Sequence, residues 1–506
     1  MNQNLIDHFK AARLCSVPVL AISSPDQTAT ITSIAAALNG GKKGSPIYRW
    51  DCVSGISPIN QAAEEKLGSL IDGAGSDMDP TIGDPVAAIR AFSDKARDRS
   101  VMFVVNSHRF LDNVVVVQII ANCRDVLKGD GRTLVLLGPV MRLPIEVAGD
   151  VVMFDEPLPN AEQLSAIVTQ AHKDAERPPV EPDVVTKAVE AVQGLPAFQA
   201  EQATALALAD RKSPLDLSQL WEHKRGQIEQ TPALKVWRGG DKFDSIGGCD
   251  VIKGFIGRIL KGHGRPNAIV FIDEIEKMFA GASGDTSGVS QDQMGTLLTY
   301  MQDQNACGMI MVGPPGSGKS AVAKAAGNEG GIPTVQLDLG ASKGSLVGDS
   351  EKNIRNALKV ITAVSNSKSL WIATSNRIAD LPPELRRRFT LGTFFFDLPT
   401  KEERLLIWKI HTSRYCLDPK ASGLYPDDTD WTGAEIRQCT DIAWRLGCTL
   451  KEAAEFVVPI AKSAGESIER LRQQAHGKYL SASQPGTYQK RTQAEPAKGG
   501  RRFHEN

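Results

Sequence analysis

The sequence predicts an α/β protein with two parallel-sheet domains, each followed by a helical segment. In the first third, apolar runs such as residues 17–22 and 101–105 alternate with stretches of helical character. A second set of apolar runs, including residues 268–272 and 370–374, begins after Phe243. Continuous apolar runs of strand length, separated by helices, are typical of parallel strands buried on both faces.

Composition narrows the functional classes. The 506 residues carry a net charge of −1, so no overall charge bias points to nucleic acid or to a membrane surface. No apolar run approaches the ~18 residues of a membrane-spanning helix, and the first ten residues lack a secretory signal. Eight scattered cysteines without a C-x-x-C pair predict reduced thiols in the cytoplasm. The eight histidines show no metal-binding spacing.

A phosphate-binding loop is the clearest motif. Residues 313–320 read Gly-Pro-Pro-Gly-Ser-Gly-Lys-Ser after an apolar strand, and a helix follows. The glycines let backbone N–H groups approach phosphate oxygens, while the lysine and the final serine serve the terminal phosphates and Mg²⁺. The expected nucleotide-binding residues here are Gly313, Pro314, Pro315, Gly316, Ser317, Gly318, Lys319, Ser320 and Ala321.

An apolar strand with two terminal carboxylates lies before this loop. Asp273 is expected to hold the metal and Glu274 to act as the base that orients water. The alternative is a helix N-terminus with favourable charges. Asp273 precedes Lys319 by 46 residues (319 − 273), whereas phosphate-loop enzymes normally place the acidic strand downstream. The sequence therefore predicts a nucleotide hydrolase with rewired βα units.

Two further features fit hydrolysis. Asn376 ends the apolar strand 370–374 and is expected to position the lytic water. Three arginines follow at 386–388, where an arginine acting on a neighbouring subunit would sit. Arg388 is favoured for this role and Arg387 comes next, although such a run is also typical of a solvated surface.

The two α/β sets resemble each other, which suggests duplication. Residues 143–147 and the following Phe-Asp segment echo residues 381–385 and their own Phe-Asp segment. The first copy lacks a Gly-Lys-Ser sequence in its loop at 23–28, and it has Asn106 and Ser107 where acidic residues would end a strand. We expect an inactive nucleotide fold, with an unrelated α/β domain as the alternative.

With these motifs in view, residues 243–440 resemble the AAA+ ATPases. Residues 243–248 are similar to the segment that contacts adenine in that family, and residues 432–435 to its lid motif. The resemblance adds Ile246, Gly247, Gly433 and Ala434 to the expected nucleotide contacts, and it implies ATP, Mg²⁺ and a homo-oligomeric ring such as a hexamer.

Residues 15–475 are most similar to the AAA ATPases related to a hypothetical plastid reading-frame protein of algae and cyanobacteria. Segments 137–144, 224–229 and 459–463 carry this part of the resemblance. That group has a degenerate first ATPase-like domain and a poorly defined cellular role, so the resemblance implies fold and chemistry rather than substrate.

The reversed motif order predicts a circularly permuted AAA+ sheet. The family's strands lie in the order 5-1-4-3-2, and this chain meets them as 3, 1, 2, 4, 5. Each crossover keeps its direction across the sheet, so handedness is preserved. Leu346 and Val347 replace the central-loop aromatic of threading unfoldases, which weakens the case for polypeptide threading. The Gly/Ser-rich stretch 281–288 is either a flexible loop or a substrate contact.

The expected domains are an inactive ATPase-like domain at 1–157, a helical linker at 158–240, the AAA+ domain at 241–399, a helical lid at 400–476 and a disordered basic tail at 477–506. The expected function is ATP hydrolysis by a remodelling or assembly factor that acts on a protein. The alternatives are an ATP-binding switch with little hydrolysis and a nucleic-acid-associated ATPase, the latter suggested only by the tail's net charge of +4 (6 − 2).

Overall fold

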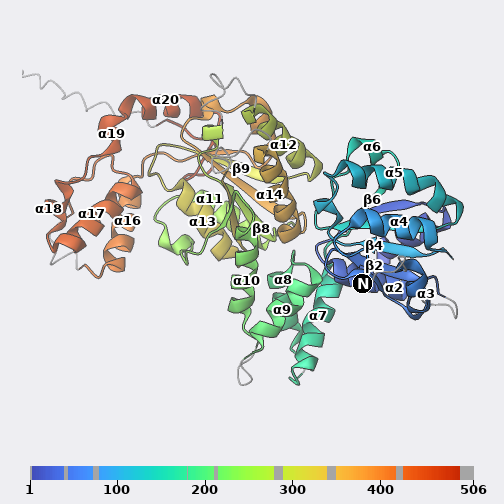
Figure 1. Cartoon of the computed structure of the whole chain (residues 1–506). Helices are drawn as coiled ribbons and strands as arrows, with labels where there is room; N and C mark the ends of the chain where they lie inside the picture. The colour runs from blue at the N-terminus through green and yellow to red at the C-terminus, as the bar shows by residue number, and fades with distance from the viewer. Residues whose placement is uncertain are drawn as a thin grey trace, which may run out of the picture. The chain divides into compact units, whose positions relative to one another are not determined.

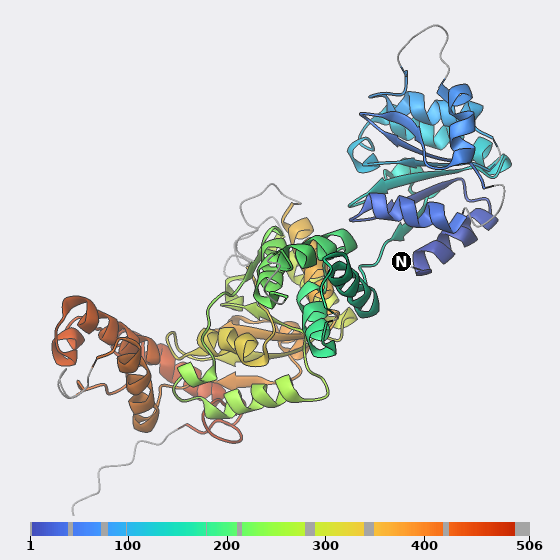
Figure 2. The same ribbon diagram turned by 90° about the horizontal axis from the view of Figure 1, so that it is seen from below.

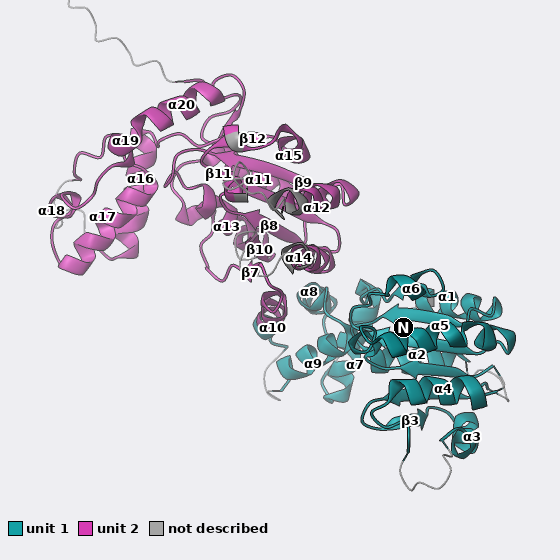
Figure 3. Ribbon diagram, turned by 45° about the horizontal axis from the view of Figure 1, so that its top comes forward, with its two compact units in different colours: residues 1–220 teal, residues 221–506 magenta. Residues whose placement is uncertain are grey.

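The chain forms two compact units, residues 1–220 and 221–506 (Figure 3). The computed structural model describes residues 3–38, 44–71, 79–97, 99–178, 180–209, 215–278, 289–338, 349–417 and 425–490. Each unit is built around one largely parallel sheet, so the predicted α/β class with two related sheet domains is confirmed.

The sheet of unit 1 has the order β3-β2-β4-β5-β1-β6. All its neighbouring strands are parallel except the hairpin of β2 with β3. Side chains of the central strands are buried on both faces, as expected for strands covered by helices. The strands are β1 (Val19–Ser23), β2 (Ile47–Asp51), β3 (Gly55–Pro58), β4 (Val101–Val104), β5 (Thr133–Gly138) and β6 (Val152–Asp155).

Helices cover both faces of this sheet (Figure 1). One face packs against α1 (Gln3–Leu14) and α2 (Gln27–Leu38). The other packs against α3 (Gln61–Ile71), α4 (Pro85–Lys95), α5 (Val114–Gly129) and the short α6 (Ile145–Ala148). A helical group follows, with α7 (Ala161–Asp174), α8 (Pro182–Val192) and α9 (Ala197–Ala207) in mutual contact.

The sheet of unit 2 has the order β13-β12-β9-β11-β8-β10-β7. Only β7 is antiparallel to its neighbour. The strands are β7 (Leu234–Val236), β8 (Ala268–Ile272), β9 (Cys307–Val312), β10 (Thr334–Leu337), β11 (Ser369–Ser375), β12 (Thr393–Phe395) and β13 (Leu480–Ser481).

The spatial order of the core strands is the same in both units. Unit 1 has β2-β4-β5-β1-β6 and unit 2 has β10-β8-β11-β9-β12. In unit 1 the strand that leads into the first loop, β1, is first in the chain, whereas its counterpart β9 follows β8. The predicted permuted strand order of the second domain is therefore confirmed, and the rearrangement is confined to that domain.

Alternate residues of the central strand β8 face opposite layers of unit 2 (Figures 1 and 2). Ile269 and Phe271 pack toward α11 (Asp250–Lys261) and α13 (Lys319–Gly330). Val270 and Ile272 pack toward the opposite layer. That layer consists of α12 (Val289–Asp303), α14 (Asp349–Ser365), α15 (Pro383–Arg388) and α20 (Gly465–Ala475).

A small helical lid follows β12 and has its own core. It contains α16 (Lys401–Arg414), α17 (Gly433–Leu446), α18 (Leu450–Ala454) and α19 (Ile460–Ser463). Its core is centred on the fully buried Trp408, which stacks on Tyr425 and contacts Trp431. Hydrogen bonds of Thr400 and Thr432 with Glu403 and Glu435 cap the first turns of α16 and α17.

The structure changes two of the expected boundaries. The expected disordered tail at 477–506 is wrong for residues 477–490, because these residues form β13 and bury Tyr488 in the core of unit 2. The division between units falls at Leu220, inside α10 (Leu217–Glu229) and within the helical segment expected at 158–240. No helix within the described ranges is long and apolar enough to cross a bilayer.

The packing of α13 against the start of β10 gives a stability prediction. A Cβ at Gly327 would lie 2.1 Å from Thr334 Oγ1 and 2.7 Å from Ile332 O. We expect Gly327→Ala to lower the free energy of unfolding by about 1–3 kcal/mol. Gly254 on α11 is a matched helical control, because a Cβ there would have no neighbour within 4 Å.

Gly254→Ala should raise the unfolding free energy by roughly 0.5–1 kcal/mol, because alanine loses less backbone entropy in a helix. Denaturant unfolding of both full-length variants, followed by circular dichroism, measures the difference. Indistinguishable midpoints for the two variants would contradict the tight α13–β10 packing.

Candidate active site

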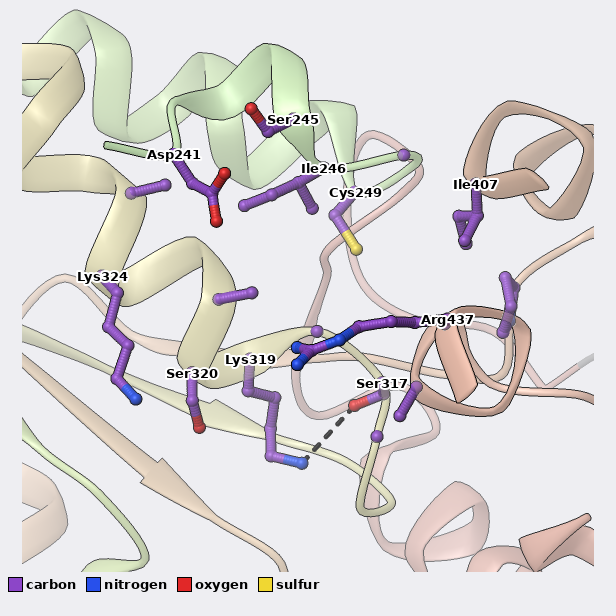
Figure 4. A pocket seen from close by; sticks show the side chains of 18 of the residues that line it. Asp241, Ser245, Ile246, Cys249, Ser317, Lys319, Ser320, Lys324, Ile407 and Arg437 are labelled. Carbon is purple, nitrogen blue, oxygen red and sulfur yellow. Dashed lines mark hydrogen bonds between the residues drawn. The ribbon is translucent and has the colours of Figure 1, made fainter. Parts of the chain in front are cut away.

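A cavity of about 460 Å³ lies in unit 2, at the ends of β8, β9 and β11. Its walls come from the loop after β9, from the polar residues that end β8 and β11, from the segment 237–249 and from lid helices α16 and α17. Figure 4 shows side chains of the loop after β9, the segment 237–249 and the lid helices around one space. Such a position, beyond the carboxyl ends of parallel strands, is where α/β sheets bind ligands.

The loop after β9 needs its glycines for conformation and for space. Gly316 and Gly318 have φ values of +79° and +95°, in the left-handed region that favours glycine. A Cβ at Gly313 would lie 2.2 Å from Phe396 O, and one at Gly316 would lie 2.8 Å from Thr432 Oγ1. The loop therefore fits tightly between the end of β12 and the lid, and a glycine-rich loop of this kind lets backbone N–H groups approach an anion closely.

Lys319 is a buried cation at the start of α13, with 6% of its surface exposed. Its Nζ donates to Gly313 O and Pro314 O at 2.8 Å each, and to Ser317 Oγ at 3.4 Å (Figure 4). Burial lowers the pKa of Lys319 to about 8, although nearby carboxylates, with Glu276 the strongest, oppose the shift. A phosphate at this position would favour the charged form further.

Asp273, Ser320 and Thr374 form a connected oxygen cluster from three separate segments. Ser320 Oγ donates to Asp273 Oδ1 at 2.8 Å, and Thr374 Oγ1 donates to the same oxygen at 2.6 Å. Despite their reversed order, the loop after β9 and the end of β8 thus meet, as the permuted sheet requires. A hydroxyl and a carboxylate are donors suited to Mg²⁺.

Glu274 and Asn376 also meet in the cavity. Asn376 Nδ2 donates to Glu274 Oε1 at 3.0 Å, and the Asn376 backbone N–H donates to Glu276 Oε1 at 2.8 Å. Glu274 has a φ of +49°, a strained conformation for a residue with a side chain. Its N–H donates to Thr374 Oγ1 at 2.9 Å, and its carboxylate pairs with Lys277. The end of β8 is thereby fastened to the end of β11.

Most of the predicted nucleotide contacts line the cavity. Gly313 and Pro314 do not line it, but their carbonyls accept from Lys319. The lining residues among those predicted are Ile246, Gly247, Pro315, Gly316, Ser317, Gly318, Lys319, Ser320, Ala321, Gly433 and Ala434, together with Asp273, Glu274 and Asn376.

The predicted arginines are the exception. Arg387 is exposed, and Arg388 donates through Nη2 to Gln302 Oε1 at 2.7 Å on α12. Neither lines the cavity of its own chain. The central-loop residues Leu346 and Val347 and the stretch 281–288 lie outside the described residues.

Sequence reasoning missed several lining residues, of which Arg437 is the most informative. Figure 4 shows Arg437 extending from α17 toward the loop that carries Lys319. Its position three residues after Ala434, on the same helix face, is a signal that could have identified it. The other missed polar residues include Asp241, Ser245, Lys324, Glu403, His411 and Arg414.

The region around His411 has an unusual electrostatic environment. Burial lowers its pKa to about 4, and its Nδ1 is buried without a hydrogen-bond partner among the described residues. Arg414, one turn further along α16, pairs with Asp241 at 2.5 Å. The His411 imidazole is therefore neutral at neutral pH in the wall of the cavity.

The equivalent position in unit 1 is closed by its own side chains. Asp26 Oδ1 accepts from Ala29 N at 3.1 Å at the start of α2, where a phosphate would otherwise accept. Gln27 Nε2 donates to Asn106 Oδ1 at 2.8 Å across the loop. These contacts fit the predicted inactive fold.

Segments of both units match family models of AAA ATPases. Residues 2–156 match the N-terminal domain of the SpoVK-like AAA ATPases, and residues 162–231 match the second domain of the same group. Residues 309–367 match the ATPase family associated with various cellular activities, AAA.

Relatives that match most of this chain occur among algae. The chain is 23% identical to an uncharacterized AAA domain-containing protein, ycf46, of Guillardia theta, over 92% of this chain and 94% of the relative. The ycf46 proteins of Trieres chinensis and Pyropia yezoensis are 24% and 21% identical over 78% and 90% of this chain, and over 79% and 94% of their own lengths. Residues 2–156, 162–231 and 309–367 are therefore similar to AAA ATPases, and the chain is similar over most of its length to the ycf46 proteins of these algae.

Proposed function

We propose that the protein hydrolyses ATP in the cavity of unit 2, with Mg²⁺ as cofactor. The observation that carries this proposal is the contact of Ser320 with Asp273 at 2.8 Å. Two motifs placed in reversed order along the chain would have no reason to meet unless they serve one site. The full set of phosphate-binding, acidic and polar residues around them favours hydrolysis over a binding-only switch.

The phosphate chain of ATP would lie along the loop 313–320. Backbone N–H groups and the N-terminus of α13 favour its negative charge, and Lys319 provides a cation held in place by two carbonyls. Arg437 on the lid adds a second cation that reaches toward the same loop. The adenine ring of ATP would lie against Ile246 and Gly247, as the resemblance implies.

Mg²⁺ fits the oxygen donors at this point. Ser320 and Asp273 would hold the ion, which would neutralise developing charge on the phosphates. Within the described residues, no group of three or more His, Cys, Asp and Glu side chains could hold a metal alone. That finding suits an ion bound through few protein ligands and the phosphates of its substrate.

Glu274 would act as the base and Asn376 would position the water. Their hydrogen bond at 3.0 Å places the carboxylate and the amide next to each other, beside the metal-binding carboxylate. The strained backbone of Glu274 turns its side chain away from the apolar strand and into the cavity. Attack of water on the γ-phosphate would transfer a proton to Glu274.

We propose that an arginine from a neighbouring subunit completes the site, since Arg387 and Arg388 do not line the cavity of their own chain. Activity would then require a homo-oligomer, and ATP hydrolysis would drive the remodelling or assembly of a protein partner. Unit 1, with its closed loop, would serve as a structural or partner-binding module. Of the six basic residues of the expected tail, Lys478 and Lys490 lie in the described segment that packs on unit 2, and the other four lie outside the described residues.

Substitutions at Glu274 and Lys319 separate chemistry from binding. Glu274→Gln should lower kcat by about 10²–10⁴-fold with ATP binding retained, because only the proton acceptor is lost. Lys319→Ala should weaken ATP binding by about tenfold or more, because a charge-assisted contact to phosphate disappears. Phosphate release and fluorescent-nucleotide titration measure the two effects. Unchanged turnover in both variants would refute the proposed site.

The pKa of Lys319 predicts a pH dependence of binding. The ammonium form binds phosphate, and the free protein loses it as pH rises through about 8. The Kd for ATP should therefore be flat below pH 8 and rise by up to roughly tenfold per pH unit above it. Titrations between pH 6.5 and 9.5 measure this profile, with Lys319→Ala as the control that should lack the rise. A flat wild-type profile would contradict the assignment.

Mixing experiments test the arginines. Arg388→Ala and Lys319→Ala proteins should each be inactive alone, yet a mixture should regain part of the activity. In mixed oligomers, an intact arginine would then face an intact nucleotide site, and such an arginine is worth about 10³-fold or more in rate. Arg386→Ala is the control and should retain activity. Absence of recovery with either Arg388→Ala or Arg387→Ala would rule out action on a neighbouring subunit.

A further inference from the structure

The C-terminal strap, residues 478–490, closes one edge of the unit 2 sheet. β13 pairs in parallel with β12 in the register Phe394 with Leu480 and Phe395 with Ser481. Ala482 extends this pairing, since its N–H donates to Phe395 O at 3.0 Å and its carbonyl accepts from Ile252 N at 3.1 Å. The strap is thereby joined to both the edge strand and the start of α11.

The strap also contacts the connection between the sheet and the lid. Tyr488 OH donates to Asp397 Oδ2 at 2.7 Å, and Arg472 on α20 donates to Asp397 Oδ1 at 2.8 Å. Tyr488 is 5% exposed and packs on Phe395 at 4.5 Å between ring centroids. Asp397 lies three residues before Thr400, the N-cap of the first lid helix. Leu398 N also donates to Asp397 Oδ1 at 2.8 Å, and the two side-chain partners of this hinge carboxylate come from the segment that follows the lid.

The strap reaches the cavity itself through Ser483, which lines it. Ser483 lies beside the Cys249 thiol in this wall, and Cys249 N donates to Glu403 Oε1 on α16 at 3.3 Å. Asp397 and Glu403 line the cavity as well. The strap, the segment 246–249 and the lid therefore form one connected wall. This wall is on the side of the cavity that is expected to receive the adenine ring.

We propose that the C-terminal strap is part of the nucleotide site, where Tyr488 and Asp397 set the core–lid hinge as positioning residues and Ser483 walls the base side of the cavity. This inference rests on the proposed ATP binding and extends it to residues more than 160 positions after the phosphate loop (483 − 320 = 163). The strap touches β12, α11 and Cys249 rather than the oxygen cluster of Asp273. Its loss is expected to change affinity more than chemistry.

Tyr488→Phe removes the hydroxyl and keeps the aromatic packing on Phe395. We expect nucleotide binding to weaken by about fivefold to tenfold, because a buried hydrogen bond to a carboxylate is lost at the hinge. The KM for ATP should rise in parallel, with kcat within about twofold of wild type. Tyr479→Phe, in the same strap, is the matched control and should behave as wild type.

Ser483→Phe tests the wall directly, with Gln484→Phe as its control. The phenyl ring at 483 should fill the base side of the cavity and weaken binding of a fluorescent ADP analogue by more than about tenfold, whereas Gln484 is exposed and does not line the cavity, so the same change there should leave affinity unchanged. Removal of residues 491–506, beyond the strap, should leave affinity unchanged. Thermal unfolding of every variant shows whether the fold is retained.

The outcomes separate the two proposals. If wild-type protein binds no nucleotide, the proposed function fails and this inference with it. If wild-type protein binds nucleotide and folded Tyr488→Phe and Ser483→Phe bind equally well, only the strap inference is overturned. If Tyr488→Phe fails to fold, the comparison of Ser483→Phe with Gln484→Phe decides the matter.

Discussion

The alignment of β8, β11 and β9 is the constraint on which the site depends. β11 pairs in parallel with β9 on one side and with β8 on the other. Their carboxyl ends therefore lie at one edge, whatever the order in which the chain supplies them. Thr374 on the middle strand touches the acidic residue that follows β8, and that residue touches the serine that follows β9. Hydrogen-bonded strand register, rather than chain order, brings the chemical groups together.

The electrostatics of the cavity depend on a buried cation that protein carbonyls satisfy only in part. Lys319 lies near Glu276, Asp273 and Glu274, and their combined negative charge keeps it protonated at neutral pH despite burial. Glu276 leaves one carboxylate oxygen buried without a hydrogen-bond partner among the described residues. Such a network is costly to keep in a core and is typical of functional sites. The close approach of lid and loop at Gly316 then limits the access of water.

Much of this site could be predicted from sequence because the conformation and chemistry of a phosphate loop depend on residues that are adjacent in the chain. Gly316, Gly318 and Lys319 lie within one loop whose backbone conformation and chemistry are encoded by neighbouring residues. The strand order expected from the two motifs also predicted that Asp273 would lie near Ser320. In contrast, Ser483, His411 and Arg437 come from segments whose approach to the cavity depends on lid packing. The ordered strap was missed because its composition is polar, and a single tyrosine and backbone pairing stabilise it.

The permuted order has a consequence for how unit 2 forms. In unit 1, two pairs of neighbouring strands are also close in chain order. β4 follows the β2–β3 hairpin and pairs with β2, and β5 follows β4 and pairs with it. Among the described core strands β8 to β12, no two successive strands are neighbours in the sheet. During synthesis, β8 therefore has no partner until β10 emerges, and β9 none until β11 does. The least separated of these pairings, Leu370 with Cys307, joins residues 63 positions apart (370 − 307), so this sheet forms only through non-local contacts.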